Sequence, residues 1–137
     1  MIMWEPLLAF ALSVLGPGLD AATIAPAIVR VIQWRADHGL PPVTESPTLD
    51  VALVAVYIRH ESSVMLDPPP VSKDARDLTS CGALQLPCSY VAKHGIARQI
   101  QYWLVNVQMS SLASVDSSPS RARRRLSEAR DALRGAI

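Results

Sequence analysis

The feature that most limits the fold is an apolar run with proline-containing segments on both sides. The run reads Leu49-Asp-Val-Ala-Leu-Val-Ala-Val-Tyr-Ile58, and a helix built from it would be apolar on nearly every side. A helix of that kind is buried at the centre of a domain. We favour a helix because the run is long for a strand and Thr48 can cap it. Its many β-branched residues would also suit a strand, which is the alternative.

The segments before this run predict two helices and a loop. Trp4–Leu15 is expected to form a short core helix, which the sequence Gly16-Pro17-Gly18 ends. Asp20 can cap a second helix that extends from Ala21 to about His38. Residues 40–47 contain three prolines, and we expect an extended linker there.

The segments after the run predict a long loop followed by more helices. Residues 63–80 carry three consecutive prolines and several charges, which is typical of an irregular functional loop. Residues 80–87 can form a turn or a short hairpin. A helical pattern then extends from Ser89 to about Ser114, where Gly95 can divide it, and Pro119 can start a last helix. The expected fold class is mainly α.

The length predicts one domain. The chain has 137 residues, and half of them are apolar, which is enough for a core. We divide it into N-terminal helices and linker (1–47), a candidate catalytic core (48–115) and a basic C-terminal helix (116–137). No stretch reaches the roughly 18 to 20 apolar residues that a membrane span needs. Met1–Leu15 carries Glu5 and lacks a basic first region, so we expect no signal peptide.

The charge is concentrated at the C-terminal end. Residues 117–137 hold six arginines against two acidic residues, a net charge of +4, while the rest holds seven basic against ten acidic residues, a net charge of −3. A basic helix, here Arg121–Arg134, is typical of a surface that meets an anionic partner. The alternative is a solvated face without a partner.

The cysteines and histidines do not predict a metal site. Cys81 and Cys88 are seven residues apart, with no CxxC pair, so either a disulfide in an oxidising compartment or two buried thiols would fit. His60-Glu61 lacks the second histidine of an HExxH motif, because position 64 is valine. No phosphate-binding glycine loop or nucleophile elbow is present, and we expect no cofactor.

Elimination among the glutamates singles out Glu61. The chain has only four: Glu5 lies in the N-terminal segment, and Glu45 lies among prolines. Glu128 falls in the arginine-rich helix, where we expect it to pair with Arg124 four residues away. Only Glu61 follows a buried apolar helix and precedes a long loop.

That position gives Glu61 a chemical rationale. Apolar surroundings favour the protonated form of a carboxyl group, and a protonated carboxyl group can serve as a general acid. The alternative is a structural role, in which Glu61 faces solvent or pairs with Arg59 or His60.

Two short blocks carry a resemblance to a known family. Glu61-Ser62-Ser63 is followed by a loop and then by Ser80-Cys-Gly-Ala-Leu-Gln-Leu-Pro87. This order resembles that of the lysozyme-like lytic transglycosylases, including the goose-type lysozyme relatives, in which a buried helix ends in Glu-Ser and a Gly-Leu-Met-Gln block follows the loop. The segment Ile100–Leu104 is similar to a later family helix, with Gln101 where the family has glycine. The family's Ala-Tyr-Asn-Ala-Gly segment is not recognisable.

The resemblance implies a lysozyme-like helical domain with a buried central helix and a long active-site loop, acting on peptidoglycan glycan strands. Glu61 would protonate the oxygen between N-acetylmuramic acid and N-acetylglucosamine, then take the proton of the muramic acid 6-hydroxyl as an anhydro ring closes. The substrate-binding residues that it implies are Ser62, Ser80, Gln85, Tyr57 and Tyr102. A hydrolytic muramidase would use a second carboxylate, for which the loop offers Asp67, Asp74 and Asp77.

The location implied is the periplasm, the exterior of the cell or a virion. A second hypothesis is a lysozyme-like domain without activity, retained as a structural or binding component of a virion or secretion machine. The missing family segment and the basic last helix favour it. An open groove with Glu61 at its base would favour the enzyme over this alternative.

Overall fold

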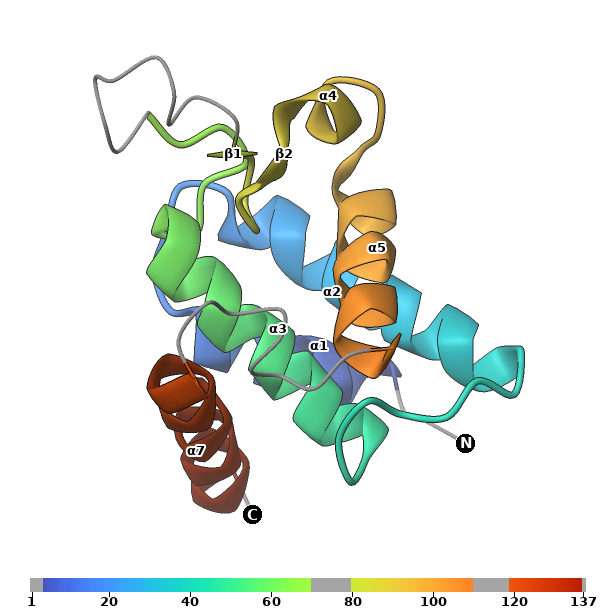
Figure 1. Ribbon diagram of the computed structural model, residues 1–137. Helices are drawn as coiled ribbons and strands as arrows, with labels where there is room; N and C mark the ends of the chain where they lie inside the picture. Colours follow the sequence, from blue (N-terminus) through green and yellow to red (C-terminus); the bar gives the residue numbers. More distant parts are fainter. Residues whose placement is uncertain (1–3, 70–79, 110–118, 137) are drawn as a thin grey trace.

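The computed structural model describes residues 4–69, 80–109 and 119–136, and within them the fold is mainly α, as expected (Figure 1). The elements follow one another in the order α1 (Trp4–Leu15), α2 (Ala21–Asp37), α3 (Pro47–Ser62), β1 (Ser80–Cys81), β2 (Leu86–Pro87), α4 (Cys88–Val91), α5 (Ile96–Met109) and α7 (Pro119–Gly135). None of the helices in these ranges is long and apolar enough to cross a membrane.

Helix α3 is the centre of the fold. Helices α1, α2 and α7 all pack against it, and α5 packs on α2 (Figure 1). Every residue from Leu49 to Ile58 is buried, which explains why all of them except Asp50 have apolar or aromatic side chains. This confirms the buried central helix, and the strand alternative is wrong.

The start of α3 differs from the expectation. Ser46, rather than Thr48, is the cap: its hydroxyl oxygen accepts a hydrogen bond from the Leu49 amide at 3.1 Å. Pro47 then occupies the first turn, where a missing N–H costs nothing. The helix therefore begins within the segment assigned to the linker, because a Ser-Pro pair is itself a start signal.

The linker before α3 is held by a buried carboxylate. Asp50 accepts hydrogen bonds from the amides of Val43 and Thr44 at 2.9 and 2.7 Å, and from the Thr44 hydroxyl at 2.6 Å. These bonds satisfy backbone donors that no helix or strand could pair. The proline-rich segment is thus an ordered loop packed on the first turn of α3.

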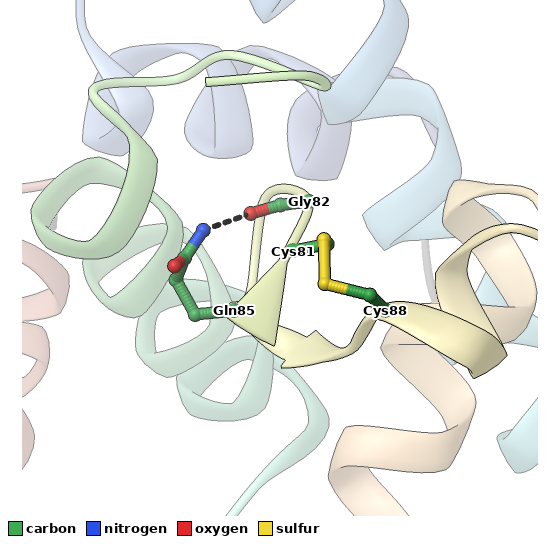
Figure 2. The surroundings of a disulfide bond; sticks show 4 residues. All are labelled: Cys81, Gly82, Gln85 and Cys88. Atoms are coloured by element: carbon green, nitrogen blue, oxygen red, sulfur yellow. Dashed lines mark hydrogen bonds between the residues drawn. A yellow bond between two sulfur atoms is a disulfide. The ribbon is translucent and has the colours of Figure 1, made fainter. Parts of the chain in front are cut away.

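The hairpin expected at residues 80–87 is confirmed. Strands β1 and β2 are antiparallel, with Ser80 opposite Pro87 and Cys81 opposite Leu86. Cys81 and Cys88 form a disulfide whose Cα atoms are 4.8 Å apart, so of the two alternatives for the cysteines the bridge is present (Figure 2). Ala83 and Leu84, in the turn between the strands, belong to the same hydrophobic core as α3.

Helix α7 covers one side of α3. Ala122 and Ala129 are buried in this contact. Glu128 pairs with Arg59 and His60 of α3, with 3.0 Å between its Oε2 and His60 Nε2. The expected pairing with Arg124 is wrong, because the packing of the two helices brings two basic side chains of α3, Arg59 and His60, to the same carboxylate.

Candidate functional site

Glu61 lies in the last turn of α3 with a half-buried side chain. It makes no hydrogen bond or ion pair with the described residues. Its neighbours are engaged elsewhere: Arg59 donates to the Val14 carbonyl oxygen at 2.9 Å, and both Arg59 and His60 pair with Glu128. The alternative in which Arg59 or His60 neutralises Glu61 is therefore wrong, and the carboxyl group remains available.

Ser62 is the last residue of α3 and is buried. Its side chain is 4% exposed, and its hydroxyl donates to the Ile58 carbonyl oxygen at 2.9 Å. The Ser62 hydroxyl oxygen in turn accepts a hydrogen bond from the Met65 amide at 3.4 Å. Through these two hydrogen bonds Ser62 connects the end of α3 to the residues that follow Glu61.

Backbone strain is concentrated in the two blocks that carry the resemblance. Among the described residues other than glycine, those with positive φ are Ser63 (53°), Val64 (62°) and Gln85 (52°). A β-branched residue such as valine is a clear outlier in this region. Strained residues persist only where their surroundings hold them, and they are frequent at active sites.

A contact with the start of α2 holds Val64 in place. The Asp20 amide donates to the Val64 carbonyl oxygen at 3.1 Å, and the Asp20 carboxylate accepts from the Leu66 amide at 2.8 Å. Val64 is buried against Gly18, where an added Cβ would lie 2.5 Å from the valine Cβ. Asp20 occupies the N-cap position of α2, as predicted, but its side chain makes no capping hydrogen bond. Its carboxylate orders residues 64–66 instead.

Gln85 ends the tight turn of the hairpin (Figure 2). Its side-chain Nε2 donates to the Gly82 carbonyl oxygen at 2.8 Å, and its backbone amide points to the same oxygen at 3.3 Å. Its amide oxygen has no hydrogen-bond partner among the described residues. The turn requires glycine at position 82, where φ is 78° and a Cβ would lie 2.9 Å from Oε1 of Gln99.

The fold brings the two blocks into one region. The hairpin turn lies beside the C-terminal half of α3 in both views, and its apolar residues share the α3 core (Figures 1 and 2). The disulfide closes the base of the hairpin, which fixes the position of the turn. Glu61 thus lies just before the strained residues Ser63 and Val64, and Gln85 is itself strained; Val64 and the hairpin turn belong to the same core.

The remaining candidate residues are placed differently. Tyr57 is 4% exposed, and its ring packs on Trp103 with centroids 4.9 Å apart, so it builds the core. Tyr102 is 37% exposed and packs on Tyr90 of α4. Ser80 is exposed in β1, as is Asp67 in the loop after α3. Asp74 and Asp77 lie outside the described residues.

A cleft of about 390 Å³ lies between α2, α4 and α5, and Glu61 does not line it. No sequence motif predicts this cleft. The signal that could have found it is the spacing of Arg30 and Trp34, which lie four residues apart on one face of α2. The described parts of the chain contain no group of three side chains that could hold a metal ion.

Comparisons of the chain with protein-family models, with curated proteins and with solved structures found no match. The resemblance to the lytic transglycosylases therefore rests on the sequence itself, that is on Glu61-Ser62-Ser63, the Ser80–Pro87 block and the segment Ile100–Leu104. The functional argument accordingly rests on the chemistry and geometry of these residues.

Proposed function

We propose that this chain is a lysozyme-like domain that cleaves peptidoglycan glycan strands, with Glu61 as the acid/base group. The observation that carries the proposal is the half-buried Glu61 carboxyl group, which has no hydrogen-bond or ion-pair partner among the described residues, while Arg59 and His60 beside it both pair with Glu128. A carboxyl group that must give and then take a proton has to be free of a permanent counter-ion. The strained residues on either side of the site give further support.

The chemistry needs one carboxyl group. Protonated Glu61 donates its proton to the glycosidic oxygen as the bond from that oxygen to C1 of the muramic acid breaks. The resulting carboxylate removes the proton of the 6-hydroxyl, whose oxygen bonds to C1 and closes a 1,6-anhydro ring. Glu61 is protonated again at the end. A muramidase would instead add water at C1, with one of the loop aspartates as the second carboxylate.

Gln85 is the second residue of the proposed site. Its Nε2 is held by Gly82, so its free amide oxygen is the group that can accept a hydrogen bond from a sugar hydroxyl. The disulfide at the base of the hairpin fits an oxidising location such as the periplasm, the exterior of the cell or a virion.

A zymogram on purified peptidoglycan tests the proposal. The wild type should clear the gel, and Glu61→Gln, which keeps the shape but cannot transfer the proton, should lose clearing by at least about a hundredfold. Glu5→Gln is the matched control, because Glu5 is exposed on α1. Clearing by Glu61→Gln at the wild-type level would overturn the assignment.

The position of the cleft favours a second candidate function, binding of glycan without cleavage within a virion or secretion machine. The cleft between α2, α4 and α5 is not lined by Glu61, whereas an open groove at Glu61 was expected of an enzyme. Under this function the wild type and Glu61→Gln bind purified sacculi equally and neither clears the gel.

A further inference from the structure

The cleft between α2, α4 and α5 has a consistent chemical character. Val31 and Ala97 give it apolar lining, and its polar groups come from Arg30 and Trp34 of α2, Tyr90 of α4, and Arg98 and Gln101 of α5. Its volume of about 390 Å³ falls in the range of about 300 to 1,000 Å³ typical of small-molecule sites. Three helices build it, so its walls do not depend on a loop.

The two arginines give the cleft a positive charge. Arg30 and Arg98 are exposed and make no ion pair with the described residues, and no acidic side chain lines the cleft. Other arginines of the fold are paired, as Arg59 is with Glu128 and Arg130 with Glu45. Two unpaired guanidinium groups facing one cavity favour an anionic ligand.

Of the remaining polar groups, Gln101 can donate to a ligand. Gln101 Oε1 accepts a hydrogen bond from buried Arg35 at 3.3 Å, and since an arginine can only donate, the Gln101 amide nitrogen is left to donate to a ligand. The Tyr90 hydroxyl already donates to the Arg98 carbonyl oxygen at 3.2 Å. This bond leaves the Tyr90 hydroxyl as an acceptor, so the donors of the cleft include Arg30, Arg98 and the Gln101 amide nitrogen, and they match a ligand that carries acceptor oxygens.

Aromatic rings provide a flat, preorganised wall. Trp34 lines the cleft with 47% of its surface exposed, and it stacks on His38 with centroids 4.1 Å apart. Tyr90 is held by ring contacts with His94 and Tyr102, at 4.2 and 4.4 Å. Rings fixed in this way can contact the apolar face of a ligand ring at little cost in side-chain entropy.

We propose that this cleft is a binding site for a carboxylate-bearing sugar. The carboxylate would pair with Arg30 and Arg98, the sugar hydroxyls would accept from Gln101, and the ring would lie on Trp34. That the ligand is a sugar rests on the proposed function, since muramic acid and its peptide carry carboxylates. The site would then hold the glycan strand at a place separate from Glu61.

The test is a titration followed by NMR at the Trp34 indole N–H, which Trp34→Phe assigns. N-acetylmuramyl dipeptide should shift this resonance, while neutral N-acetylglucosamine and inorganic phosphate should bind at least about tenfold more weakly. The double variant Arg30→Gln/Arg98→Gln should raise the Kd for the muramyl dipeptide at least about tenfold, because charge-assisted hydrogen bonds are lost. Arg124→Gln, an exposed arginine of α7, is the control and should bind like the wild type.

Three results would overturn the proposal: no shift with the muramyl dipeptide, equal affinity for phosphate or the neutral sugar, or unchanged binding by the folded double variant. The same titration on Glu61→Gln separates the two proposals. Glu61→Gln is expected to bind the muramyl dipeptide as the wild type does. If the wild type binds in the cleft and does not cleave glycan, the binding proposal holds and the enzymatic proposal fails. If the wild type cleaves glycan and the cleft binds no muramyl dipeptide, the enzymatic proposal holds and the binding proposal fails.

Discussion

At the scale of single residues, three neighbours on α3 have different roles. Arg59 and His60 connect the helix to α7 through Glu128, while the Glu61 carboxyl group has no partner in the part of the chain that the structure describes. Directly afterwards the chain turns through Ser63 and Val64, both with positive φ. The turn depends on Gly18, because Val64 packs where a side chain at position 18 would start.

Gly18→Ala is therefore expected to destabilise the protein. The new Cβ would lie 2.5 Å from the Cβ of Val64, and backbone atoms would have to shift. Overpacking of this kind costs about 1 to 3 kcal/mol in the free energy of unfolding, which urea denaturation measures.

Gly95→Ala is the matched control for this substitution, since nothing lies within 4 Å of a Cβ at position 95. Equal unfolding midpoints for the two variants would refute the Gly18–Val64 contact.

At the scale of elements, the hairpin and α7 are each fixed by a specific bond. The hairpin has only two residues in each strand, so the Cys81–Cys88 disulfide supplies a constraint that its few backbone bonds cannot. Helix α7 relies on a narrow apolar stripe and on Glu128. The disulfide and the Glu128 pair can each be removed by substitution without changing the other.

Replacing both cysteines by serine is expected to lower the free energy of unfolding by about 2 to 3 kcal/mol, as loop-closure entropy predicts for a seven-residue separation. Chemical denaturation of the wild type with and without reducing agent measures the same loss. Reduction should leave the stability of the double serine variant unchanged, and a further loss there would show that the effect lies elsewhere.

The pair between α7 and α3 should depend on pH. Burial acts to raise the pKa of Glu128, but the hydrogen bond to His60 and the charges of Arg59 and His60 outweigh it and lower the pKa below its ordinary value of 4.5. The charged pair therefore stabilises the fold above about pH 4.5 and is lost as the pH falls through the lower folded-state pKa.

Urea midpoints at pH 7 and pH 3 for wild type and Glu128→Gln test this sign. The variant should be less stable than the wild type at pH 7 by less than about 1 kcal/mol, because the pair is partly exposed, and the difference should shrink at pH 3. A difference that grows as the pH falls would contradict the assigned pairing.

At the scale of the whole molecule, the sequence predicts the elements better than the contacts between them. Hydrophobic periodicity and turn residues predict the central helix, the hairpin and the division near Gly95, because these signals are local. Asp20 with Leu66 and Arg59 with Glu128 lie 46 and 69 residues apart, so no local pattern could reveal them. The cleft combines side chains from three helices and was missed for the same reason.

The candidate site divides in the same way. Elimination among four glutamates selects Glu61 as the candidate acid/base residue, which stays a prediction, and residues 80–87 predict a turn or short hairpin, whose turn ends in Gln85. The burial of Tyr57 and Ser62 depends on how α5 and the loop after α3 close over them, which spacing along the chain does not encode. The sequence therefore predicts a candidate site at Glu61, whereas the burial of the residues around it follows only from the packing.

The most direct test of the central claim is to count the new ends formed on purified glycan strands. Wild type, Glu61→Gln and Glu5→Gln would be incubated with the strands, and mass spectrometry would quantify 1,6-anhydro and reducing ends. We expect anhydro ends from wild type and Glu5→Gln, and at least about a hundredfold fewer from Glu61→Gln. Anhydro ends formed equally fast by Glu61→Gln would contradict the role of Glu61.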